Sequence, residues 1–282
     1  MIDNRMVTFL ELCNVMNYRK TAENLNMTQP AVTQHIHYLE EMYGCKLFDY
    51  ANRKLRLTPK GIQLEKYARS IMALHLSAKE EVEKTEKVKI NIGATKTIGD
   101  YALPPSFFSI IGSEQYELSF FIDNTENLLN KLDHFDLDLL LVEGYIDKGK
   151  YQHRHISTEE LVGICAKTHP FANKEVTLEA VFQESIIFRE KGSGTRSILE
   201  NFLLQQGYTL DRFQNKAFIS SNKLIEEIVE SNLAVSFVYD VIATKNQHLA
   251  TFRIKGQTIT HAFHYVFINE NKAKKKIIEL LL

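Results

Sequence analysis

The stretch 20–48 constrains this chain most, because it predicts two helices joined by a tight turn. Asn26-Met27 interrupts the first helix, and Thr28 is a good N-cap for the second, since its hydroxyl can accept a bond from a free backbone N–H of the next turn. Pro30 falls in that first turn, where its missing N–H costs little.

The second helix has one apolar face and one polar face. Val32, Ile36 and Leu39 recur at helical spacing and predict a buried stripe, and Gly44 suits a left-handed stop. The outward positions near the helix start carry polar side chains, as in a recognition helix that enters the major groove by its N-terminal end. An ordinary surface helical hairpin fits the same periodicity. The outward positions are Thr28, Gln29, Thr33, Gln34 and His37.

Residues 21–48 resemble the winged helix-turn-helix of the LysR-type transcriptional regulators. The resemblance rests on Thr28-Gln-Pro-Ala-Val-Thr33, Ile36, Leu39-Glu40, Gly44, Leu47-Phe48, Leu57-Thr58-Pro59 and Gly61. The chain departs from the family pattern at four positions. Thr28 and Thr33 stand where serine is usual, His35 where glutamine is usual, and Tyr50 where an arginine is usual.

The segment 49–57 predicts the wing, two short strands around a turn that carries cations. Without the usual arginine, its charge is left to Arg53, Lys54 and Arg56. Cations there can follow phosphates, whose attraction is independent of sequence. A solvated basic hairpin is the alternative. The expected DNA-binding residues are Thr28, Gln29, Pro30, Thr33, Gln34, His37, Arg53 and Lys54.

Residues 59–87 predict one long helix, with Thr58 as its cap and Pro59 at its first position. Its apolar residues follow near-heptad spacing, and the same helix of a second subunit would cover them. A homodimer is therefore expected, and in the resembled family this segment is the linker helix. The apolar positions are Leu64, Tyr67, Ala68, Ile71, Leu74, Ala78 and Val82.

Composition bounds the possible functions. With 282 residues the chain predicts about two domains, and a net charge of −1 requires local charge to bind DNA. Three cysteines without CxxC spacing favour a reduced cytoplasm. Charges at Asp3, Arg5 and Glu11 argue against a signal peptide, and no apolar run reaches about 18 residues, so no membrane span is expected.

From Val88 onward, strand and helix patterns alternate, which predicts an α/β module with parallel, doubly wound sheets, better divided into two small sheets than one. Separate strands are expected at 152–156 and 161–166, and a closing helix at 272–281. The resemblance implies two α/β lobes like those of periplasmic binding proteins, with hinge strands at 156–161 and 259–262. The expected division is 1–58 for DNA binding, 59–87 for the linker, and 88–282 for effector binding, with lobe I at about 88–160 and 261–282 and lobe II at about 161–260.

Hydroxyl-rich loops follow several predicted strands, and strand ends with helix N-termini are where open α/β folds bind ligands. Facing loops of this kind would suit a small anion, and the family's effector cleft lies at matching places. Simple helix capping explains any single residue equally well. The effector-binding candidates are Thr95, Thr97, Asn124, Thr125, Glu143, Ser193 and Thr195.

Other chemistry finds little support in the sequence. The histidines lack the spacing of a metal site, Gly192-Ser-Gly-Thr195 is not a P-loop, and no nucleophile motif is present, so no cofactor, metal or catalytic residue is expected.

The sequence thus predicts a LysR-type regulator, most similar to the branch that controls inorganic sulfur or carbon assimilation. Its expected partners are an inverted repeat of double-stranded DNA, a small or anionic effector, RNA polymerase, and itself as a homodimer or homotetramer. The alternatives are a solute-binding or sequestration protein that does not bind DNA and, with less support, an α/β enzyme.

Overall fold

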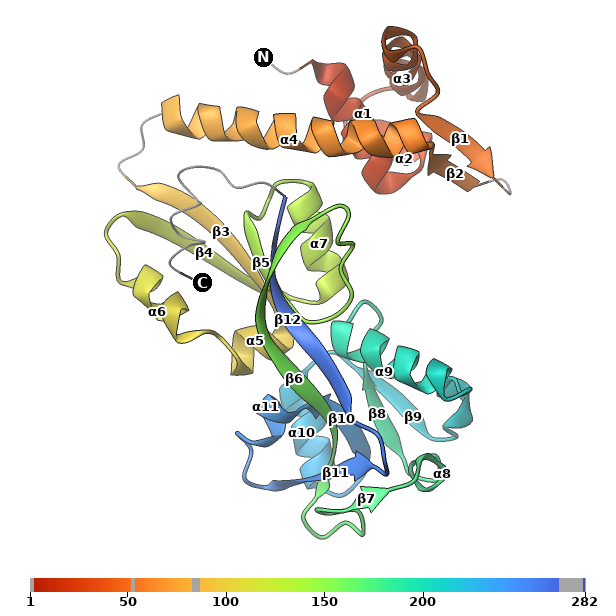
Figure 1. Cartoon of the computed structure of the whole chain (residues 1–282), viewed down its shortest axis with the longest axis vertical. Coiled ribbons are helices and arrows are strands. Elements are labelled where there is room, and N and C mark those ends of the chain that lie inside the picture. The colour runs from red at the N-terminus through yellow and green to blue at the C-terminus, as the bar shows by residue number, and fades with distance from the viewer. Residues whose placement is uncertain (1–2, 52–53, 83–86, 269–280, 282) are drawn as a thin grey trace.

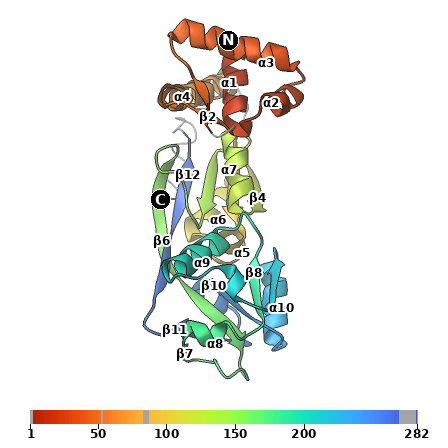
Figure 2. The same ribbon diagram turned by 90° about the vertical axis from the view of Figure 1, so that its right-hand side faces the viewer.

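The computed structural model describes residues 3–51, 54–82, 87–268 and 281. A small N-terminal unit sits on a long helix, and beneath them lies an α/β module of two lobes (Figure 1). A view turned by 90° shows the same three parts stacked along the long axis of the molecule (Figure 2).

The N-terminal unit is a winged helix-turn-helix of α1 (Asn4–Val15), α2 (Tyr18–Asn24), α3 (Gln29–Tyr43), β1 (Phe48–Ala51) and β2 (Lys54–Leu57). The local signals in the sequence set the bounds of α3. Thr28 Oγ1 accepts from the backbone N–H of Ala31 at 3.4 Å, and Gly44 ends the helix with φ of +62°. The predicted stripe of Val32, Ile36 and Leu39 is buried.

The long helix α4 (Pro59–Val82) begins at the predicted cap, where Thr58 Oγ1 accepts from the N–H of Gly61 at 3.0 Å. Residues 83–86, over which the helix was also expected, lie outside the described residues. The predicted seam divides in two. Ala68 and Leu64 pack into the core of the N-terminal unit, whereas the remaining members are exposed. These exposed members are Tyr67, Ile71, Leu74, Ala78 and Val82.

One hydrogen-bonded sheet runs through both lobes. At one end β3 (Val88–Thr95) pairs in parallel with β4 (Tyr116–Asp123) and β5 (Leu139–Val142). At the other end β8 (Ile186–Arg189) pairs in parallel with β9 (Lys216–Ile219) and β10 (Val235–Tyr239). Two α/β lobes are confirmed, but the expectation of separate, parallel sheets is wrong, because antiparallel strands join the two ends.

The joining strands are β6 (Gln152–Ala166) and β12 (Ile259–Phe267), which pair antiparallel from Leu161↔Ile259 to Gln152↔Phe267. The prediction of two strands at 152–156 and 161–166 is wrong, because the polar residues between them continue the ladder opposite β12. Two further strands were not predicted. They are β11 (Leu249–Ile254), which pairs with β6, and the short β7 (Glu175–Val176).

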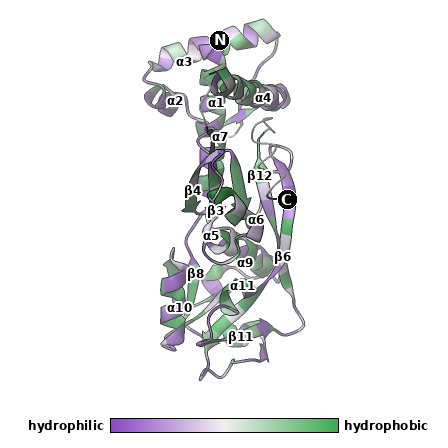
Figure 3. Ribbon diagram, turned by 90° about the vertical axis from the view of Figure 1, so that its left-hand side faces the viewer, coloured by the Kyte–Doolittle hydropathy of each residue, from purple (hydrophilic) through white to green (hydrophobic). Residues whose placement is uncertain are grey.

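Helices cover the sheet and bury one face each. In Figure 3, α10 carries both colours, as expected for a helix between core and solvent. The closing helix predicted at 272–281 lies outside the described residues, apart from Leu281. Among the described helices, none is long and apolar enough to span a membrane. The helices of the module are α5 (Lys96–Tyr101), α6 (Pro105–Ile111), α7 (Thr125–Asp133), α8 (Leu178–Val181), α9 (Gly194–Gln205), α10 (Asn222–Glu230) and α11 (Asp240–Ala243).

Candidate functional site

The outer face of α3 carries the residues expected to contact DNA, and their side chains are exposed. Two of these side chains are held by neighbours in their own helix. Thr33 Oγ1 donates to the carbonyl of Gln29 at 3.1 Å, and His37 Nε2 lies 3.2 Å from a carboxylate oxygen of Glu41. The face is short and polar at its N-terminal end, where a recognition helix meets base edges.

A groove of about 630 Å³ separates the start of α3 from the wing. It is lined by Gln29 of α3, by Tyr50 and Lys54 of the wing, and by the segment 16–19. The segment contributes Arg19, whose side chain is 87% exposed and which was not among the expected residues. Arg53 lies outside the described residues. The groove brings cations and a polar helix start together on one surface.

Two features of this unit differ from the simplest expectation. His35 turns inward, and its Nδ1 lies 2.8 Å from Thr8 Oγ1 of α1, so this departure from the family pattern serves packing between helices. Arg56, expected to add charge to the wing, forms two bonds to the carboxylate of Asp49, at 2.7 and 3.3 Å. Arg56 remains exposed, but this pairing balances its charge against that of Asp49.

A second cluster of polar groups lies where the two lobes meet. Glu143, which follows β5, is 2% exposed, and Thr95 Oγ1 at the end of β3 donates to its carboxylate. Thr125 Oγ1 at the start of α7 donates to the Glu143 carbonyl at 3.1 Å. Ser193 and Thr195 approach from lobe II, at the start of α9. The structure therefore gathers six of the seven expected residues: Thr95, Thr97, Thr125, Glu143, Ser193 and Thr195.

Asn124, the seventh expected residue, has a local role. Its side chain accepts from the N–H of Asn127 at 2.9 Å and caps α7. For Asn124, helix capping therefore describes the geometry better than effector binding does.

Burial raises the pKa of Glu143 to about 7, against the opposing effect of the Arg189 guanidinium and of the Thr97 and Thr195 hydroxyls. Arg189 ends β8 and is 4% exposed, and its Nη1 donates to Asn222 Oδ1 at 2.7 Å. A carboxyl group of this kind changes charge near neutral pH, so it can both donate and accept a hydrogen bond.

Several buried polar atoms of this cluster have no hydrogen-bond partner. Buried polar groups are normally paired, because an unpaired one costs about 1–3 kcal/mol. Ser193 begins α9 as its N-cap residue, yet its hydroxyl caps no amide. A ligand between the lobes would supply the missing partners. The unpaired atoms are Ser193 Oγ, Asn222 Nδ2 and Tyr239 OH, whereas the Thr97 and Thr195 hydroxyls lie close enough to the Glu143 carboxyl to stabilise its charged form.

The lobes are in direct contact beside the cluster. A Cβ added at Gly194 would lie 2.2 Å from the carbonyl oxygen of Glu143, so only glycine allows this approach. Lys96 of lobe I donates to Glu190 at 3.1 Å and to the carbonyl of Ser220 at 2.8 Å, both in lobe II. A cavity of about 510 Å³ beside the cluster is lined by residues of both lobes, including Thr125, Gly194 and Arg196.

Sequence reasoning missed three buried members of the cluster: Arg189, Asn222 and Tyr239. Arg189 left a signal, because a charged residue closes the otherwise apolar strand 186–189. Tyr239 and Asn222 left none, since each resembles an ordinary strand or helix residue. Among the described residues, no group of three His, Cys, Asp or Glu side chains could hold a metal ion.

Comparison with known proteins identifies two families along the chain. Residues 4–62 match "Bacterial regulatory helix-turn-helix protein, lysR family", and residues 84–281 match "LysR substrate binding domain". Similar relatives include the HTH-type transcriptional regulator CysL of Bacillus subtilis, 27% identical over 98% of this chain and 94% of that protein. A probable RuBisCO transcriptional regulator of Cyanidium caldarium is 28% identical over 79% and 73%. The solved structure of full-length CbnR in complex with its target DNA has the same fold, with a TM-score of 0.56 at 16% identity over 100% and 99%.

Ser193→Ala tests whether the Ser193 hydroxyl serves the fold. Because this hydroxyl is buried without a partner, we expect its removal to raise the free energy of unfolding by about 1 kcal/mol. The matched control is Ser221→Ala, which removes a cap bond to Leu224 and should cost about 1 kcal/mol. Denaturant unfolding of both variants measures the difference, and equal losses would mean that Ser193 is a structural cap.

Glu143→Gln should remove a dependence of stability on pH. The pKa of Glu143 in the folded state, about 7, lies above the ordinary 4.5, so its contribution is present at low pH and lost as the pH rises through about 7. Between pH 4.5 and about pH 8 the wild type should lose roughly 3 kcal/mol relative to the variant. The free energy of unfolding of both proteins, measured across this pH range, checks the prediction. The control is Glu117→Gln, at an exposed residue. Parallel curves for wild type and Glu143→Gln would contradict the prediction.

Proposed function

Since the chain belongs to the LysR family of DNA-binding transcriptional regulators, we propose that it binds promoter inverted repeats as an oligomer and responds to a small metabolite or anion between its two lobes. The observation that carries the effector part is the cluster of buried, unpartnered polar atoms at the lobe junction. The exposed polar face of α3 beside the wing supports the DNA part. Regulation rather than catalysis is proposed, in line with the relatives.

The proposed oligomer forms through α4. Tyr67, Ile71, Leu74, Ala78 and Val82 make an exposed apolar stripe along this helix, and Val82 is 80% exposed. A stripe of that length on a solvent-facing helix is best covered by the same helix of a second chain. A two-fold dimer then presents two copies of α3, as an inverted repeat requires.

The proposed effector acts by shifting the arrangement of the lobes. It can do so only if it binds one arrangement more tightly than another. The resulting change in spacing or angle of the paired α3 helices would alter DNA bending and contact with RNA polymerase at the promoter. Binding to promoter DNA implies that the protein works in the cytoplasm.

The buried Glu143 bears on which effectors fit. An anion would meet a repulsive carboxylate unless Glu143 carries a proton, whereas Arg189 and the free amides at the start of α9 favour negative charge.

A thermal-shift screen of the full chain with small anions and metabolites, at two pH values, tests the effector part. A compound that stabilises the wild type but not Ser193→Ala supports the site, because a ligand stabilises the folded state by mass action. Equal stabilisation of both proteins would mean that the compound binds at another site.

Two kinds of substitution should separate base reading from phosphate binding. We expect Gln29→Ala and Thr33→Ala to weaken specific DNA binding, by about 1–3 kcal/mol each, with little effect on non-specific binding. Lys54→Ala should weaken binding to all sequences and reduce the salt slope by about 1. Titrations at two salt concentrations with specific and scrambled DNA measure both effects, with the exposed Lys167→Ala of lobe II as control. Unchanged specific binding in the Gln29 and Thr33 variants would exclude this face.

Leu74→Glu should dissociate the oligomer. Leu74 is 60% exposed on α4, so the change leaves the single chain folded but buries a charge in any helix pair. Sedimentation analysis should report a smaller species than the wild type. The control is Leu233→Glu, at a residue that is 69% exposed on lobe II. If only the control changed the mass, α4 would not be the pairing surface.

A further inference from the structure

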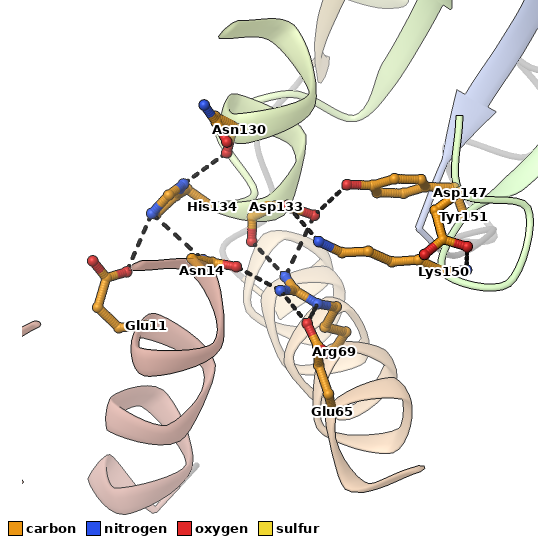
Figure 4. A network of polar contacts seen from close by, with 10 residues as sticks. All are labelled: Glu11, Asn14, Glu65, Arg69, Asn130, Asp133, His134, Asp147, Lys150 and Tyr151. Carbon is orange, nitrogen blue, oxygen red and sulfur yellow. Dashed lines mark hydrogen bonds and ion pairs between the residues drawn. The ribbon is translucent and has the colours of Figure 1, made fainter. Parts of the chain in front are cut away.

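Helix α7 contacts a different part of the molecule at each end. At its N-terminus, Thr125 bonds the Glu143 carbonyl and the N–H of Glu126 donates to the carbonyl of Gly192 in lobe II, at 3.2 Å. At its C-terminus, Asp133 and His134 meet α1 and α4 of the N-terminal unit (Figure 4). The helix therefore runs from the lobe junction to the DNA-binding unit.

The contact at the C-terminus centres on one buried ion pair. Arg69 of α4 is 2% exposed, and its Nη1 donates to the Asp133 carbonyl at 3.0 Å and lies 3.6 Å from its carboxylate. The same guanidinium bonds Glu65 at 2.7 and 3.0 Å and Asn14 of α1 at 2.5 Å. We refer to Arg69, Asp133 and the side chains bonded to them as the latch.

Lobe I completes the latch from a neighbouring loop. Lys150 Nζ donates to Asp133 Oδ2 at 2.6 Å, and Tyr151 OH donates to Asp133 Oδ1 at 2.9 Å. Beside it, His134 Nε2 lies 3.1 Å from Glu11 of α1. Figure 4 shows these side chains converging from α1, α4, α7 and the loop that precedes β6. Arg69 and Lys150 balance the charges of Glu65 and Asp133, so the latch buries no net charge.

A buried and balanced ion pair holds two surfaces in one geometry. Separating Arg69 from Asp133 would break the bond to the Asp133 carbonyl and the 3.6 Å ion pair, and would bring water to a guanidinium that is 2% exposed, while Glu65 stays with Arg69 and Lys150 stays with Asp133. The contact therefore favours a docked state or an undocked state over intermediate positions. This property distinguishes the latch from exposed pairs such as Lys89 with Glu117, which are screened by solvent.

Helix α7 is fixed firmly to lobe I between its two ends. Leu128 and Leu132 are buried against the sheet, and a Cβ added at Gly93 of β3 would lie 2.7 Å from the Leu128 side chain. The helix has no room to slide independently, so it moves with lobe I as a rigid element.

We propose that the latch holds the DNA-binding unit and lobe I as one body, so that a movement between the lobes also reorients α3. The inference rests on the proposed function, because it assigns the path by which the effector site reaches the DNA-reading surface.

An experiment without ligand tests the latch. It uses the substitution Gly194→Ala to push the two lobes apart, and we call such a substitution a wedge. The added Cβ would lie 2.2 Å from the Glu143 carbonyl and must displace lobe II from lobe I. Hydrogen exchange is measured on the full chain in peptides of α1 and of α4 around Arg69. We expect the wedge to change exchange there by about 2- to 30-fold. In an Arg69→Met background, which removes the bonds to Asp133 and Asn14, the wedge should change exchange at the lobe junction alone.

Two outcomes would overturn the proposal: no change in α1 and α4 when the junction peptides respond, or the same change with and without Arg69. Gly144→Ala, whose Cβ would lie 2.8 Å from the Gly194 Cα, is the second wedge, and Arg69→Gln is the second latch variant, so a misfolded protein does not leave the question open. Arg253→Met, which removes the ion pair with Glu160 in lobe II, is the control and should preserve the coupling. Because neither DNA nor effector is used, failure here is distinct from failure of the proposed function.

Discussion

The pairing of β6 with β12 is the constraint on which the rest of the module depends. These two strands hydrogen-bond from Leu161↔Ile259 to Gln152↔Phe267 and pass from one lobe into the other. Each lobe adds its parallel strands to this pair, β5 on β12 and β10 on β6. The strand ends that carry Glu143 and Arg189 therefore face each other across the junction.

The two ends of α7 show opposite ways of burying polar groups. In the latch, Arg69 and Asp133 have several partners each, and removing one partner of such a pair costs about 3–5 kcal/mol. At the lobe junction, the Ser193 and Tyr239 hydroxyls and the Asn222 amide nitrogen have no partners. The paired cluster stabilises one geometry. The unpaired cluster lacks hydrogen bonds that a bound ligand could supply, so the protein without a ligand is less stable than it could be. Natural binding sites commonly give up stability in this way.

Glu143 links the chemistry of the junction to its mechanics. Its carboxyl group accepts from Thr95, and its carbonyl accepts from Thr125 and touches Gly194 of the other lobe. A ligand that changes the charge of this residue would therefore act at the point where the lobes meet. The raised pKa of about 7 places that change of charge within the range of neutral pH.

The sequence by itself determined features that depend on neighbouring residues. Thr28, Pro30 and Gly44 set the bounds of α3 through backbone groups within one turn, and its polar face follows from helical periodicity. The hydroxyls after the strands could also be predicted, because strand ends and helix starts are local patterns. The family pattern added the two lobes, which alternation alone did not divide.

Only the tertiary structure decided what depends on distant partners. The polar residues 157–160 show no strand pattern of their own, and only the family resemblance implied a hinge strand there; β12 supplies their ladder from about a hundred positions further along the chain. Arg69 reads as one more cation on an exposed helix, and the structure buries it against Asp133, 64 residues away. His35 reads only as a departure from the family pattern, and the structure turns it toward Thr8. Each outcome depends on which groups meet in space, and the spacing of residues along the chain carries no record of that.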